Sequence, residues 1–158
     1  MPERQDYVQR LLEELRHSLA EVAKYRQAGS FDAALLTLLH AQERLFVRPV
    51  QEFMTRPVAE QVHLLALGET TAHAREKCIV YASLLAEAGR TYEAKGQPAM
   101  GRGADAVALH VLLLAARQFP SAEAAGLPAR IAAQLERVPA AGLNAEIRAL
   151  LPPSAGPA

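Results

Sequence analysis

The chain has 158 residues, which is enough for one compact domain with a buried core. Its 17 basic and 17 acidic residues balance in number and along the sequence, so there is no dense basic face for nucleic acid. The single cysteine, Cys78, excludes an internal disulfide and is typical of a reducing compartment. The first ten residues are charged, and no window holds the roughly 18 apolar residues of a membrane span. We therefore expect a cytoplasmic protein with neither nucleic acid nor membrane as a partner.

The composition predicts an all-α fold. Alanine, leucine, glutamate and arginine are abundant, tryptophan is absent, and no run alternates valine, isoleucine or threonine as a strand would. We expect a single helical domain over residues 1–151. Residues 152–158 are rich in proline and small residues, and we expect this tail to be disordered.

The N-terminal third predicts a helical hairpin. Apolar residues recur at helical spacing from about residue 4 to residue 28, and Gly29 follows as a stop. Ser30 is a suitable N-cap for a second helix over residues 31–46, and Pro49 ends that pattern. A joint this short folds two helices antiparallel.

The connector over residues 47–58 is too apolar for a solvated loop, since it contains Phe53 and Met54. We expect a short helical turn there, followed by a brief helix over 59–67. The apolar side chains of this stretch are either a lid on the core or an exposed patch for self-association. They are Phe46, Val47, Val50, Phe53 and Met54.

The second half predicts one long helix over residues 70–95, which Gly96 ends. The next helix begins either at Pro98 or, if the intervening glycines keep the chain irregular, at Asp105, and it stops before Pro120. Two shorter helices are expected over 127–138 and 140–151, where they would cap the end of the array.

Gly89 lies in the middle of the long predicted helix, where glycine costs about 1 kcal/mol relative to alanine. Small residues on the following helix would allow a close helix–helix contact at this point. The residues that we expect to pack the two hairpins together are Tyr25, Gly29, Ala34, Leu38 and Ala41 in the first, and Gly89, Tyr92, Gly96, Ala108, Leu112 and Ala115 in the second.

This order of residues resembles the tetratricopeptide (TPR) signature, in which an L-G-x2-Y helix pairs with an A-x3-F helix that ends near a proline. The first hairpin repeats the order, with Val22 where the signature has glycine. The segments "QDYVQRLLEEL", "AGSFDAALLTL" and "LLAEAGRTYEAKG" are similar to a small bacterial family of unknown function with TPR-like structure. This resemblance covers residues 5–120 and implies a fold, with no catalytic residues to carry over.

Few side chains suggest chemistry. Glu60 and His63 have the E-x-x-H spacing of di-iron helical bundles, but the nearest second pair, Glu69 and His73, is wrong by one residue. His110 lies in an apolar run, which favours a core or rim residue over a metal ligand. We expect Cys78 to be a small buried apolar residue. We therefore predict neither a cofactor nor a metal site nor catalytic residues.

The first helix of each TPR-like hairpin lines a concave groove. By register, the groove would contain Arg16, Leu19, Ala23 and Arg26 from the first unit, and Ser83, Ala86, Arg90 and Glu93 from the second. Its three arginines have the geometry to bind the carboxylate of a peptide, since guanidinium groups grip carboxylates in a two-pronged way. The alternative is that these are ordinary solvated positions on amphipathic helices.

The sequence thus predicts a non-enzymatic adaptor that binds a protein or peptide. A self-associating structural homodimer is the second hypothesis, and a helical-bundle metal binder built on Glu60, His63 and His73 is the third.

Overall fold

The computed structural model describes residues 2–121 and 126–152. These residues contain seven α-helices, two short 3-10 turns and no strand, so the predicted all-α fold is confirmed. The α-helices are α1 (Pro2–Gln27), α2 (Phe31–Phe46), α3 (Val58–Ala66), α4 (Thr71–Ala94), α5 (Pro98–Gln118), α6 (Gly126–Arg137) and α7 (Ala145–Leu150). The 3-10 turns are η1 (Val50–Glu52) and η2 (Ala140–Gly142).

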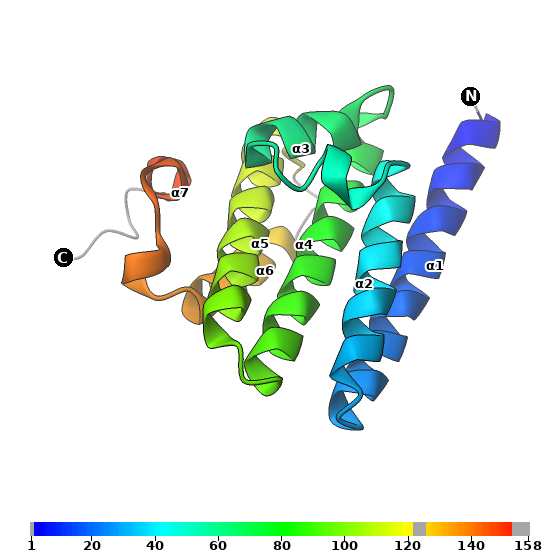
Figure 1. The fold of residues 1–158 in the computed structure, drawn as a ribbon. Coiled ribbons are helices and arrows are strands. Elements are labelled where there is room, and N and C mark those ends of the chain that lie inside the picture. The colour runs from blue at the N-terminus through cyan, green and yellow to red at the C-terminus, as the bar shows by residue number, and fades with distance from the viewer. Residues whose placement is uncertain (1, 122–125, 153–158) are drawn as a thin grey trace.

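The helix α4 is the centre of the molecule, because it contacts α1, α2, α3 and α5. The hairpin α1–α2 lies on one side of the pair α4–α5, and α7 lies on the opposite side (Figure 1). The helix α3 crosses one end of these long helices (Figure 1). The array therefore has two ends with different surroundings.

The two hairpin joints have the same backbone structure. Gly29 and Gly96 both adopt the left-handed conformation, with φ of 78° and 88°. The residue after each glycine donates its N–H to the carbonyl of a tyrosine five residues earlier, Tyr25 in one case and Tyr92 in the other, both at 2.8 Å. These bonds satisfy carbonyls that the helix end would otherwise leave unpaired, and they explain the repeated Tyr-x3-Gly spacing.

The connector between the hairpins is mostly a lid on the core. Phe46 and Phe53 are buried and stack with ring centroids 3.9 Å apart. The ring of Tyr81 on α4 meets Phe46 edge-on at 4.8 Å, and its hydroxyl donates to Gln61 Oε1 at 2.5 Å. Val47 and Met54 of the same connector remain exposed. Phe46 and Phe53 thus act as the predicted lid, whereas Val47 and Met54 form exposed apolar surface.

A buried carboxylate fixes the start of α1 against the start of α4. The side chain of Glu69 is only 1% exposed and pairs with Arg4 and with Lys77, whose Nζ lies 3.5 Å away. This pairing accounts for a lysine that is buried beside the core.

One predicted helix start is confirmed and one predicted helix is corrected. The helix α5 begins at Pro98, the first of the two predicted starts, because proline at the first helical position lacks only an N–H that would be unpaired anyway. The single helix expected over 140–151 is wrong: η2 ends at Gly142, and Asn144 starts α7 afresh by accepting a hydrogen bond from Ile147 N–H at 2.8 Å. Residues 153–158 of the expected disordered tail lie outside the described residues.

The C-terminal helices cover α5. Leu109 and Leu113 of α5 form a second small core with Val138 and Ile147, which belong to the segment around η2 and α7. The expectation that no window is apolar enough for a membrane span is wrong for α5, which is long and apolar enough by length and composition, and 56% of the relevant window is buried inside the fold. This degree of burial explains its apolar character, since a helix at the core of a protein is hydrophobic nearly all round.

Candidate functional site

Four of the predicted groove residues lie around a common pocket. Leu19 of α1 and Ser83, Ala86 and Arg90 of α4 line a pocket of about 280 Å³. The opposite wall comes from α6, with Arg130 and Gln134 among its residues. We call this the α1–α4–α6 pocket.

The predicted arginines are paired within the chain. Arg26 and Arg90 share Glu87, at 3.2 and 3.0 Å, and the Arg16 guanidinium lies 3.3 Å from Glu76. Arg130, which was not among the predicted residues, donates to Ser83 Oγ at 3.5 Å and forms no ion pair within the described residues. The cationic group best placed for a ligand in this pocket is therefore Arg130, whose position depends on how α6 folds back.

Glu93, the remaining groove candidate, belongs to a different cluster. Its carboxylate lies 3.3 Å from Arg137, which also contacts Asp105 at 3.3 Å. Gln134 donates to the carbonyl oxygen of Asp105 at 2.9 Å. This cluster attaches α6 to the α4–α5 hairpin and is a structural feature of the fold.

Gly89 allows that cluster to form. A Cβ on Gly89 would lie 2.4 Å from Asp105 Oδ1, and a Cβ on Gly101 would lie 2.8 Å from the carbonyl oxygen of Gly89. The groups of α5 that come closest to Gly89 are thus Asp105 and Gly101, and neither is among the packing residues predicted on α5, which were Ala108, Leu112 and Ala115. The other packing residues that it named on α2 and α5 are buried: Ala34, Leu38, Ala41, Ala108, Leu112 and Ala115.

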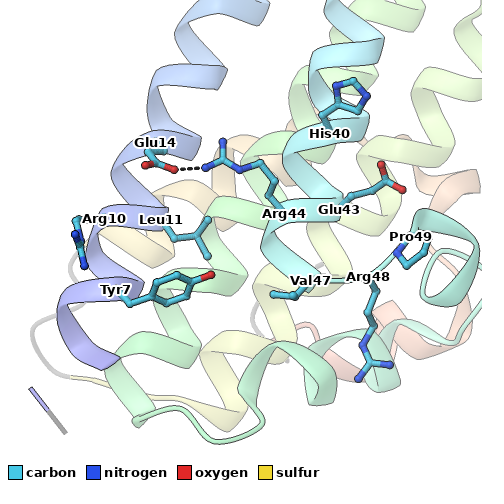
Figure 2. A pocket seen from close by; sticks show the side chains of 10 residues that line it. All are labelled: Tyr7, Arg10, Leu11, Glu14, His40, Glu43, Arg44, Val47, Arg48 and Pro49. Carbon is cyan, nitrogen blue, oxygen red and sulfur yellow. Dashed lines mark hydrogen bonds and ion pairs between the residues drawn. The ribbon is translucent and has the colours of Figure 1, made fainter. Parts of the chain in front are cut away.

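A larger cleft than the α1–α4–α6 pocket lies on the outer side of the first hairpin. It measures about 990 Å³ and is formed where the start of α1 runs beside the end of α2. Tyr7 and Leu11 line one wall and Val47 lines the other, as Figure 2 shows. We call it the hairpin cleft.

Charged side chains surround the apolar walls of the hairpin cleft. Arg44 pairs with Glu14 across the two helices (Figure 2), and Glu43 accepts the Val50 N–H at 2.9 Å. Arg10 donates to the backbone carbonyl of Asp6, and Arg48 also lines the cleft. Within the described residues neither arginine forms an ion pair, and neither does Glu43. Three arginines (Arg10, Arg44 and Arg48) face two glutamates (Glu14 and Glu43) in the lining, so the net charge of the hairpin cleft is positive.

Val47 has an unusual backbone. Its φ of 55° is the one positive value for a non-glycine residue among the described residues. A β-branched side chain is strained in this left-handed region, where glycine or asparagine is usual. Val47 is nevertheless 73% exposed, so packing against the core does not explain the choice of residue.

Sequence reasoning missed the hairpin cleft, although a signal was present. Once a hairpin centred on Gly29 is expected, residues at equal distances from it on the two helices lie side by side. This rule pairs Glu14 with Arg44 and Leu11 with Val47. The α1–α4–α6 pocket had no comparable signal, because the position of α6 depends on long-range packing.

The residues weighed for catalysis or metal binding lie apart. No group of three histidine, cysteine, aspartate or glutamate side chains in the described ranges could hold a metal ion. His63 is exposed, and Glu60 lies 4.0 Å from Arg56. Cys78 is fully buried, and burial raises the pKa of its thiol to about 12 although the Lys77 ammonium opposes this. A thiol in this state is a poor nucleophile.

No protein-family model, curated protein or solved structure matches this chain.

Proposed function

We propose that the protein is a non-enzymatic docking module of TPR-like build, which binds an acidic amphipathic segment of a partner protein in the hairpin cleft. The helix contacts support the TPR-like part of this proposal. The helix α4 packs against both helices of the preceding hairpin, and α6 packs against α5, the second helix of the next hairpin. Stacked hairpins of this kind present extended surfaces for other proteins.

The observation that carries the docking proposal is the composition of the hairpin cleft. Tyr7 and Val47 are 51% and 73% exposed, and Arg10 and Arg48 flank them without an ion-pair partner in the described ranges. An amphipathic helix laid into the cleft would bury its apolar stripe against Tyr7 and Val47. Acidic side chains beside that stripe would then meet the two guanidinium groups, which bind carboxylates with two parallel hydrogen bonds.

A direct test uses a fluorescein-labelled helical peptide with leucines on one face and glutamates beside them, read by fluorescence anisotropy. We expect saturable binding that weakens with added salt, since exposed charges are screened. Reversing both cleft charges with Arg10→Glu and Arg48→Glu should weaken binding by roughly tenfold or more, because two attractions become repulsions.

The matched control places the same charge change on α5, with Arg102→Glu and Arg117→Glu, two exposed residues far from the cleft in sequence. This control should bind the peptide like the unmodified protein. Equal loss in both double variants would mean that only net charge matters, and the docking proposal would then be wrong. A second control peptide with lysine in place of glutamate should not bind.

Self-association is the second candidate, and one observation favours it. Of the seven large apolar side chains that are exposed in the described residues, four belong to the first hairpin and its C-cap: Tyr7, Tyr25, Leu36 and Val47. A second copy of the chain would also cover them. Light scattering separates the two proposals, because a stable dimer that Tyr7→Ala and Val47→Asn dissociate would favour self-association.

A further inference from the structure

A separate pocket lies between α2 and α5, with α4 as its floor. It measures about 260 Å³ and differs from the hairpin cleft and the α1–α4–α6 pocket in having no charged side chain in its lining. Leucines from α2 and α4 and small residues from α5 form most of its walls. We call it the α2–α5 pocket.

Two buried glutamines line this pocket, and one of them has an unpaired acceptor atom. Gln42 of α2 is only 4% exposed, and its Oε1 has no hydrogen-bond partner among the described residues. The Oε1 of Gln61, by contrast, accepts from Tyr81, and its Nε2 donates to the Arg56 carbonyl at 3.0 Å. An unpaired buried acceptor costs free energy, which a donor brought into the pocket would recover.

We infer that the α2–α5 pocket binds a small neutral aromatic molecule that carries one N–H or O–H donor, such as an indole or a phenol, with Gln42 as the acceptor. The volume suffices, because a dry apolar cavity of about 150 Å³ already accommodates benzene. A charged ligand is disfavoured, since the lining offers it no counter-charge. Met54, which is 42% exposed beside the pocket, is a flexible side chain that can adjust to the ligand.

The chain contains no tryptophan, so indole emission reports only on added probe. We would titrate the protein with indole and with 1-methylindole, which has the same ring but no N–H. Indole should bind more tightly by roughly fivefold, the usual worth of one hydrogen bond. In Gln42→Leu this preference should disappear, while circular dichroism verifies that the helices persist.

A matched pair of variants at Gly103 tests the location. Gly103 lines the pocket, and no atom lies within 4 Å of a Cβ built there, so larger side chains fit without strain. Gly103→Leu should fill the space and weaken both probes at least fivefold. Gly103→Ala raises helix propensity as Gly103→Leu does, but the alanine side chain is too short to fill the pocket. We therefore expect Gly103→Ala to leave the binding of both probes unchanged.

Several outcomes would overturn the inference: no saturable binding of indole, an indole preference that persists in Gln42→Leu, or equal binding by the two Gly103 variants. Tighter binding of N-acetyltryptophanamide than of indole would also overturn it, because the occupant would then be a tryptophan side chain of a partner peptide. The hairpin-cleft variants should not affect indole binding, which keeps this test independent of the docking proposal.

Discussion

The two hairpins are joined in the same way and packed differently. Between α4 and α5, Gly89 and Gly101 bring the two helix backbones together and leave room for the carboxylate of Asp105. Between α1 and α2, the position that corresponds to Gly89 holds Val22, which is fully buried. Apolar side chains therefore fill the first interface, where the second has backbone contact and the buried carboxylate of Asp105, which pairs with Arg137 of α6.

The outer faces of the hairpins differ as well. The helices α6 and α7 pack on α5, whereas the outer side of α1–α2 carries the hairpin cleft and exposes Tyr7 and Val47. Repeat arrays require polar or covered ends to stay soluble. The comparison shows that the close helix packing lies at the α4–α5 end of the fold, whereas the exposed cleft lies at the α1–α2 end.

The largest expected effect concerns the close approach of α4 and α5. Gly101→Ala places a Cβ 2.8 Å from a backbone oxygen of the neighbouring helix, so the helices must separate. We expect a loss of about 1–3 kcal/mol in the free energy of unfolding, measured by urea denaturation, despite the better helix propensity of alanine. Gly103→Ala, on the open side of the same helix, should instead gain up to about 1 kcal/mol. Equal free energies of unfolding for the two variants would show that the close contact between α4 and α5 does not require glycine at position 101.

The ion pair between Asp105 of α5 and Arg137 of α6 should have the next largest effect. Asp105→Asn keeps the shape beside Gly89 but removes the charge that faces Arg137, and we expect a loss of about 1–3 kcal/mol in chemical denaturation. Amide exchange in α6 should accelerate, because Gln134 and Arg137 hold this helix against α5. The control is Asp32→Asn, whose side chain is 88% exposed, with an expected change below about 0.5 kcal/mol.

The third prediction concerns the open end. Val47→Gly relieves the left-handed strain and removes an exposed side chain, so we expect a gain of about 1 kcal/mol in thermal or urea unfolding. The same variant should bind the acidic peptide more weakly, because it deletes one apolar wall of the hairpin cleft. Leu36→Ala, an exposed change on the same hairpin, should leave stability within about 0.5 kcal/mol. If the variant is more stable but binds the peptide with unchanged affinity, the Val47 side chain does not take part in docking.

The smallest effect is a pH dependence at the covered end. His110 of α5 is buried, and its Nε2 lies 3.9 Å from Glu146 of α7. Burial lowers the pKa of His110, and the Glu146 carboxylate opposes this. As the pH is lowered below the ordinary histidine pKa of about 6.5, the unfolded chain binds a proton before the folded chain does. The free energy of unfolding therefore decreases as the pH is lowered through this range, and His110 has no effect on it at higher pH.

His110→Gln should flatten this part of the stability profile between pH 5 and pH 7, whereas Glu146→Gln should steepen it by removing the favourable charge. The exposed His17 provides the control, since His17→Gln should leave the profile unchanged. A profile that is equally steep with and without His110 would assign the acid sensitivity to other groups.

The sequence was informative wherever the structure depends on local signals. Gly29, Gly96 and Pro98 determine where helices end and begin through their own backbone preferences, so the main helices and both joints could be predicted. The break before α7 was also readable, because asparagine is a favoured N-cap, but the apolar run around Asn144 obscured it.

Contacts between distant segments could not be predicted in the same way. The approach of Asp105 to Gly89 depends on how two helices rotate about their axes, and small residues alone suggested Ala108 instead. Of the expected groove, Leu19, Ser83, Ala86 and Arg90 do share a pocket, while Glu93 belongs to the cluster around Arg137. Arg16 and Arg26 of α1 pair with glutamates of α4, and the periodicity of α1 does not reveal such partners on another helix.

Cys78 lies on α4, the helix at the centre of the array, and its thiol is fully buried. An alkylating reagent needs the thiolate, so it can react only when α4 has parted from its neighbours and the thiol regains an ordinary pKa. Because the chain has no second cysteine, each molecule is labelled once. The rate of Cys78 labelling in native buffer therefore reports the opening of the core, and mass spectrometry can measure it for every variant described above.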